Sequence, residues 1–108
     1  MRNLRREVEA IARIELLRAN DEHPLFASNH EGFMVMYEEL NEANQEITEA
    51  NEAAELLMDA VFSDNYETAL DHAHKVERLA IEAACEAIQT AAMARKFKDS
   101  YYNRLVSE

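Results

Sequence analysis

The sequence predicts an all-α protein, and three observations support this prediction. Ala, Glu and Leu dominate the 108 residues, which include a single Gly and a single Pro. Apolar side chains recur every three or four positions over long stretches, as on one face of an α-helix. No stretch shows the two-residue alternation of a half-buried strand. We therefore expect a helical bundle of three to four helices, two of them long, in a single domain over residues 1–108.

The first helix is expected over residues 1–20, where apolar side chains follow helical spacing. Its apolar stripe consists of Leu4, Val8, Ile11, Ile14 and Leu17. Pro24 disfavours helical geometry at the residue before it, so residues 21–29 should form a loop. Leu25 and Phe26 are apolar, which indicates that this loop folds back onto the protein.

Two longer helices should follow this loop. Ser28 and Glu31 match a capping box and place the start of a helix over residues 29–62. Ser63 or Asp64 is expected to cap the next helix, over residues 65–98. Residues 99–108 are polar and carry aromatic side chains, so a tail or a short fourth helix is expected there.

The charge is strongly acidic and unevenly distributed. The formal net charge is −11, and no Lys or Arg occurs between Arg18 and Lys75, where fourteen Asp and Glu residues lie. Such a surface argues against non-specific binding to nucleic acid or to anionic membranes. A phosphate-bearing ligand in this region would need a cation to mediate the contact.

Other sequence features restrict the cellular setting. Cys85 is the only cysteine, which rules out an internal disulfide framework. We find no signal-peptide pattern and no apolar run long enough to span a bilayer. A cytoplasmic location is therefore expected.

Two acidic sets lie on different predicted helices. The first set follows the apolar stretch 33–37, and the second lies within an arc of about 60° on the helical wheel. The sets are Glu38, Glu39 and Glu42, and then Glu82, Glu86 and Gln89. If they face each other, their oxygens form a hard site suited to Mg²⁺ or Mn²⁺. The alternative is that both are solvated helix faces, with Arg78 and Glu82 as an ordinary i,i+4 pair.

The segments HEGFMVMYEELNE (30–42) and EAIQTAAMARKF (86–97) resemble the MazG-like family of all-α nucleoside triphosphate pyrophosphohydrolases. The likeness is closest to its small phage and bacterial branch and covers about residues 5–97. The EExxE motif of that family falls on Glu38, Glu39 and Glu42. Its ExxD motif falls on Glu86 and Gln89, where Gln replaces Asp. An amide oxygen can coordinate a metal but brings no charge.

The resemblance implies an enzyme that converts an NTP or dNTP and water to a nucleoside monophosphate and pyrophosphate. It implies Mg²⁺, with Mn²⁺ as a substitute, and a bundle assembled as a homodimer or a dimer of dimers. Glu38 and Glu39 would be catalytic. The implied metal ligands are Glu38, Glu39, Glu42, Glu86 and Gln89, and the expected substrate contacts are Asn20, His30, Lys75 and Arg78.

Three other interpretations fit the same residues. A catalytically silent MazG-like dimer could bind nucleotide or serve a structural role, and Gln89 favours it. A di-iron bundle needs two Glu-x-x-His motifs, whereas the chain offers only the near match Asp71-x-x-His74. A helical adaptor without a ligand would also use long amphipathic helices.

Overall fold

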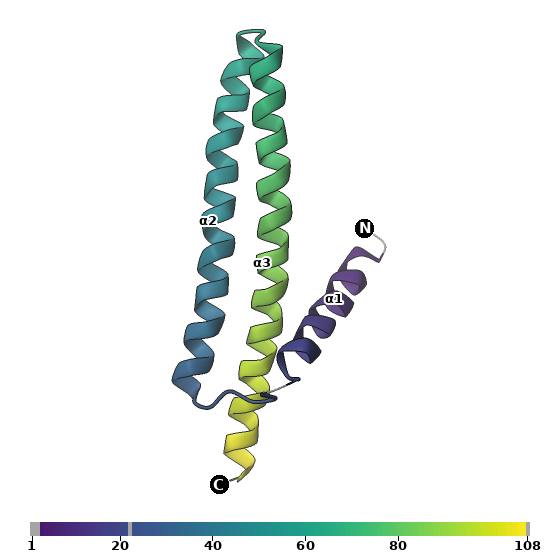
Figure 1. Cartoon of the computed structure of the whole chain (residues 1–108), viewed down its shortest axis with the longest axis vertical. Helices are drawn as coiled ribbons and strands as arrows, with labels where there is room; N and C mark the ends of the chain where they lie inside the picture. Colours follow the sequence, from purple (N-terminus) through teal and green to yellow (C-terminus); the bar gives the residue numbers. More distant parts are fainter. Residues whose placement is uncertain (1–2, 22, 108) are drawn as a thin grey trace. The chain divides into compact units, whose positions relative to one another are not determined.

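A computed structural model describes residues 3–21 and 23–107 of the chain (Figure 1). Every regular element within these residues is an α-helix, which confirms the all-α prediction. The helices are α1 (Leu4–Ala19), α2 (Asn29–Phe62) and α3 (Tyr66–Ser107). Among the described residues, no helix has the combination of length and apolar character needed to cross a bilayer.

The ends of the helices differ from the prediction mainly in α3. The bounds of α2 agree with the expected 29–62, and α1 lies within the expected 1–20, of which residues 1 and 2 fall outside the described part. The prediction of a separate tail or short helix over 99–108 is wrong, because α3 continues without a break to Ser107. No Gly or Pro interrupts the chain there, and Arg95 pairs with Asp99 at 3.2 Å across the predicted junction.

The start of α2 has the Ser28 half of the predicted capping box, whereas Glu31 bonds the backbone of Ala27 and not that of Ser28. The Glu31 backbone N–H donates to Ser28 Oγ at 3.1 Å, and Glu31 Oε1 accepts a hydrogen bond from the Ala27 N–H at 3.1 Å. These two bonds satisfy backbone donors that a helix start would otherwise leave without partners. The local sequence therefore determines where α2 begins.

A Schellman motif joins α2 to α3. The Asn65 N–H donates to Ala60 O, the Asp64 N–H donates to Val61 O, and Asp64 adopts φ 57°. Asn65, and not Ser63 or Asp64, caps α3, since its Oδ1 accepts a hydrogen bond from the Thr68 N–H at 3.3 Å. The predicted cap is wrong because the left-handed backbone at Asp64 moves the helix start one residue later.

Packing divides the chain into two compact units. The first unit comprises Met1–Leu40 with Glu86–Glu108, and the second comprises Asn41–Cys85. Both α2 and α3 contribute residues to each unit. The single domain over 1–108 stays a prediction.

The core of the first unit forms around the loop residue Phe26. Phe26, Ala92 and Met93 are buried together. The half-buried side chains that pack against them are Leu16, Ala19, Val35, Met36 and Phe97. The predicted return of the loop to the protein is confirmed for Phe26, whereas Leu25 is exposed.

The last turns of α3 hold this loop in place. The Phe26 N–H donates to the buried Ser100 Oγ at 2.9 Å, and Arg104 Nη2 donates to Phe26 O at 2.7 Å. Lys96 is buried, and its Nζ lies 4.7 Å from the centre of the Phe26 ring. The contacts of Ser100 and Arg104 depend on the extension of α3 beyond Lys98.

The chain's only glycine is required where the loop meets α2. A Cβ on Gly32 would lie 2.7 Å from Phe26 Cδ2 and 3.0 Å from Phe97 Cδ2. Both distances are shorter than ordinary carbon–carbon contacts. Gly32 thus allows two aromatic rings to approach the first turn of α2.

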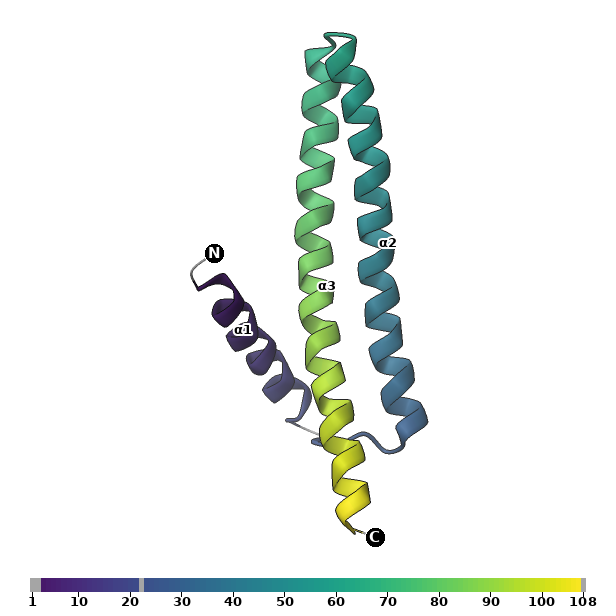
Figure 2. The same ribbon diagram turned by 180° about the vertical axis from the view of Figure 1, so that it is seen from behind.

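The second unit is an antiparallel pair of helical segments joined by a short turn (Figures 1 and 2). Its buried side chains are almost all alanine: Ala43, Ala53, Ala60, Leu79 and Ala83. Its larger apolar side chains are mostly exposed, among them Ile47, Leu56, Met58, Val61, Leu70 and Ile81. Small side chains let the two helix backbones approach each other closely.

Candidate metal centre

Three carboxylates from α2 and α3 lie close together. One oxygen each of Glu39, Glu42 and Glu86 lies within 4.8 Å of the others. Glu42 follows Glu39 by three residues on the same unbroken helix, so the two side chains share a face of α2. The structure therefore brings together three of the five residues predicted to hold a metal.

The environment of these carboxylates is partly shielded from water. Glu39 and Glu86 are half-buried, and Glu42 is exposed. Negative charges at such separations repel one another, and the repulsion grows as water is excluded. A divalent cation would offset this repulsion.

Two carboxylates of the predicted acidic sets lie outside this group. Glu38 is exposed and lies about 100° from Glu39 around the axis of α2. Glu82 pairs with Arg78 of its own helix at 3.3 Å. The structure therefore does not place Glu38, expected to be a catalytic residue and a ligand, with the three converging carboxylates.

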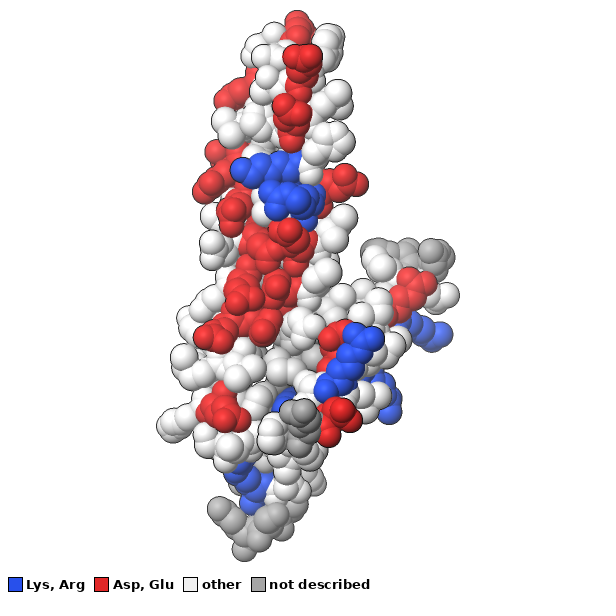
Figure 3. All heavy atoms as spheres, viewed as in Figure 1, with Lys and Arg blue, Asp and Glu red and all other residues white. Residues whose placement is uncertain are grey.

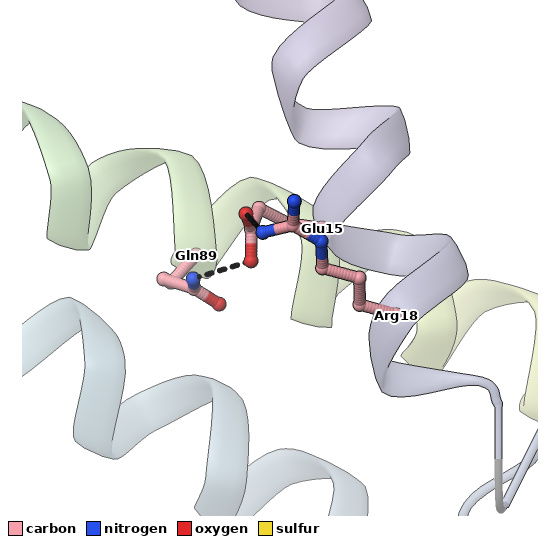
Figure 4. Close-up of polar contacts among 3 residues, drawn as sticks. All are labelled: Glu15, Arg18 and Gln89. Atoms are coloured by element: carbon pink, nitrogen blue, oxygen red, sulfur yellow. Dashed lines mark hydrogen bonds and ion pairs between the residues drawn. The ribbon is translucent and has the colours of Figure 1, made fainter.

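Gln89 contacts α1. Its Nε2 donates a hydrogen bond to Glu15 Oε2 at 2.9 Å, and Arg18 Nη1 contacts Glu15 Oε1 at 3.1 Å (Figure 4). Sequence reasoning missed Glu15. One signal was present, since Glu15 lies between Ile14 and Leu16 in an apolar stretch, but no pattern could have identified Gln89 as its partner.

The residues expected to contact substrate are distributed over both units. Asn20 and His30 belong to the first unit, and Lys75 and Arg78 belong to the second. His30, Lys75 and Arg78 are exposed, and Arg78 is paired with Glu82. Their roles stay predictions.

Asn20 occupies a distinctive position. It caps the C-terminus of α1, and its Oδ1 is buried without a hydrogen-bond partner. It also lines an open groove of about 510 Å³ in the first unit, together with residues of α1 and α3 that include Arg13 and Arg95. None of the three converging carboxylates lines this groove.

The surface charge follows the sequence asymmetry. Figure 3 shows acidic side chains gathered over α2 and α3. Basic residues of the first part of the chain lie on α1, where Arg5, Arg6 and Arg13 are exposed, while Arg2 lies outside the described residues. An anionic substrate that approached the acidic side would meet repulsion unless a cation intervened.

Comparisons with known proteins do not identify the chain. No family model, curated protein or solved structure matches it. The resemblance to the MazG-like family therefore rests on the two segments of the sequence that carry its motifs.

Proposed function

We propose that the chain is a Mg²⁺-dependent nucleoside triphosphate pyrophosphohydrolase of the MazG-like type. The observation that carries this proposal is the convergence of Glu39, Glu42 and Glu86. The two motifs of the resemblance lie far apart in the sequence, and residues of both contribute to the same group. If the likeness of the two motifs to the family arose by chance, the acidic side chains of the two motifs would not be expected to lie close together.

The donor set fits magnesium. Mg²⁺ binds oxygen at about 2.1 Å, so oxygens on opposite sides of the ion are separated by roughly 4.2 Å. The three carboxylate oxygens lie within 4.8 Å of one another, so they would have to draw closer to share one ion. Hard carboxylate oxygens are also the ligands that Mg²⁺ and Mn²⁺ prefer.

The protein's own groups would have two tasks. When bound, Mg²⁺ would neutralise charge on the triphosphate and polarise the phosphate under attack. Glu39, Glu42 and Glu86 would hold the ion. One carboxylate of the EExxE motif would accept a hydrogen bond from the attacking water and so orient it toward the α-phosphate. Glu39 is the predicted catalytic residue assigned to this second task, because Glu38 lies outside the group.

The substrate would be an NTP or dNTP that leaves as a monophosphate and pyrophosphate. Lys75 and Arg78 are the cations assigned to the outer phosphates, and Asn20 and His30 are assigned to the nucleoside. The unpartnered Oδ1 of Asn20 supports a polar role for this residue. The absence of Lys and Arg from residues 19–74 supports a metal-mediated phosphate contact in the acidic region.

A homodimer or a dimer of dimers is part of this proposal. Phe33, Met34 and Tyr37 are exposed in the first unit, and large apolar side chains are exposed in the second. A second copy would cover such surfaces by helix–helix packing. Replacement of Ile47 and Ile81 by Gln should shift sedimentation toward the monomer; unchanged assembly would argue against a contact through these residues.

A second candidate function is a catalytically silent member of the same family. The hydrogen bond between Gln89 and Glu15 favours it, because this amide has a structural partner in place of the acidic ligand of the family. Mg²⁺ titration by calorimetry separates the two candidates. A silent protein should bind Mg²⁺ weakly or not at all.

Pyrophosphate release from a panel of ordinary and modified nucleotides, with Mg²⁺, tests the activity. Glu39→Gln combined with Glu42→Gln should lower turnover by about 100-fold or more, since the charge that holds the ion is lost. Glu49→Gln is the matched control, a half-buried glutamate of α2 outside the group. No turnover by the unaltered protein on any nucleotide would refute the activity.

A further inference from the structure

We propose that one face of the second unit is the contact between two copies of this chain, and that the α2 segment of each copy packs there against the α3 segment of the other. This inference rests on the proposed function only for the expectation of a dimer. It adds which face is used and which helices pair.

In the second unit, α2 carries a row of exposed side chains that alternates steps of three and four residues. This spacing keeps side chains on one face of a helix, as in the contact stripe of a coiled coil. All members of this α2 row are exposed, and Ile47, Met58 and Val61 each keep about half of their surface in water. The α2 row consists of Asn44, Ile47, Asn51, Ala54, Met58 and Val61.

A second row on α3 has the same spacing but smaller side chains. The members of this α3 row are Leu70, Ala73, Glu77, Ala80 and Ala84, and all of them are exposed. Three of the five are alanines, so larger side chains can approach this helix closely. Interiors pack densely where large side chains meet small ones. The face is therefore complementary to a copy of itself.

Both rows lie on the same side of the second unit. The α2 row lies roughly 110° around its helix from the buried Ala43, Ala53 and Ala60. The α3 row lies roughly 120°, in the same rotational sense, from the buried Leu79 and Ala83. Because the two segments are antiparallel, these equal offsets bring both rows to one side of the pair (Figures 1 and 2).

This face carries little of the charge of the unit. Residues 41–85 contain eleven Asp and Glu residues but only two Lys and Arg residues. The acidic residues of α2 in this range all lie about 80° or more from Ile47 around the helix, and Glu77 is the only carboxylate in either row. Two copies joined through this face would keep their acidic sides apart and in water, whereas a basic partner would be attracted to the acidic side.

The size of the face suits a dimer. About 20 residues of each helix give a length of roughly 30 Å, and two helices side by side are roughly 20 Å wide. The resulting area, roughly 600 Å² before the relief of the side chains is counted, approaches the ~800 Å² that each partner contributes to a standard interface. Monomers rarely expose apolar patches larger than a few hundred Å².

The large and small rows favour one way of pairing the copies. With the twofold axis parallel to the helices, the α2 row of each copy lies on the α3 row of the other, and residues equally distant from the turn meet. Asn51 and Glu77 both lie thirteen residues from Asp64. The Asn51 amide could then donate a hydrogen bond to Glu77 of the second copy. With the axis perpendicular to the helices, large side chains would meet large ones and alanines would meet alanines.

Sedimentation of the unaltered protein and of Ala84→Glu tests the face. Ala84 is exposed, so the variant should keep its fold, which circular dichroism checks. We expect the dimer dissociation constant to rise roughly 100-fold or more, because the contact would bury a charge without a partner. Gln45→Glu is the matched control, since it adds the same charge roughly 160° from Ile47 and should leave the dimer unchanged. A monomeric unaltered protein, or a dimer that Ala84→Glu does not weaken, would overturn the inference.

Disulfide cross-linking tests the pairing of the helices. Ile47→Cys and Ala80→Cys are placed in separate chains that also carry Cys85→Ala, so any link between them joins two copies. Coexpression should yield oxidised dimers that contain one chain of each kind, because a disulfide needs Cα atoms within about 7 Å. Gln45→Cys with Ala80→Cys should yield none. Links formed only by Ile47→Cys with itself would overturn the proposed pairing.

The outcomes also distinguish this inference from the proposed function. If the cross-links form as expected but no nucleotide releases pyrophosphate, only the activity fails. If the unaltered protein releases pyrophosphate while Ala84→Glu remains a dimer of unchanged affinity, only the inferred contact fails.

Discussion

The two units of the chain are built from the same two long helices but bury different side chains. The first unit encloses Phe26, Met93 and Ala92 and adds hydrogen bonds between residues more than seventy positions apart. The second unit buries mostly alanines, and the side-chain hydrogen bonds of Thr48, Ser63 and Thr68 and the Arg78–Glu82 ion pair each join residues at most four positions apart.

This difference shows how each unit is specified. In the first unit, a loop residue, a glycine and the end of α3 must all be present for the core to close. In the second unit, local helix formation and small side chains suffice to bring two helix segments together. We therefore expect the first unit to respond sharply to loss of volume and the second to respond to added volume.

Phe26→Ala should have the largest effect on stability. Removal of this buried ring should cost about 3–5 kcal/mol in the free energy of unfolding, because a cavity remains among Met93, Phe97 and their neighbours. Urea denaturation measures the loss. Phe33→Ala, which removes a half-exposed ring, should cost much less, and equal losses would contradict the assignment of the core.

Ala53→Leu should be the most damaging enlargement in the second unit. Ala53 is 2% exposed, and a larger side chain would push the two helix segments apart, at a cost of about 1–3 kcal/mol. Ala10→Leu, at an exposed position of α1, controls for helix propensity and should be nearly neutral. Hydrogen exchange should become faster within Asn41–Cys85. Uniform changes along the chain would argue against close packing of the two helix segments through buried alanines.

Gly32→Ala should have two opposing effects on stability. Alanine favours helix by about 1 kcal/mol, but its Cβ would meet the buried Phe26 ring at 2.7 Å. We expect a net loss of about 1–2 kcal/mol, measured by thermal denaturation. The loss should shrink when Phe26→Leu is added, because the ring that the Cβ meets is then absent. A gain in stability from Gly32→Ala alone would show that the rings move aside.

Asp64→Gly should produce the smallest change and the only gain. Asp64 has φ 57°, a backbone conformation that glycine adopts without steric cost, so the variant should be stabilised by about 0.5 kcal/mol. Asp64→Ala should instead lose about 1 kcal/mol, since alanine lacks the tolerance of Asp for this conformation. Two equal results from calorimetry would indicate that the turn changes its geometry.

The site was predictable in part. The spacing in EELNE places Glu39 and Glu42 one turn apart on a helix, and the likeness to a second motif selected Glu86. Spacing separates Glu38 from Glu39 by about 100° around the helix, but it does not show which of the two faces α3. Glu15 was missed for the same reason, since its partner lies 74 positions away.

The sequence by itself determined the helical content, the start of α2 and the loop at Pro24, because these depend on propensities and hydrogen bonds within a few residues. Only the tertiary structure decided which carboxylates lie close together, which alanines are buried between the helix segments of the second unit, and why α3 continues to Ser107. A helical periodicity specifies the direction in which each side chain points. It does not specify the neighbour that the side chain meets, because that neighbour belongs to another helix or to a loop distant in the sequence.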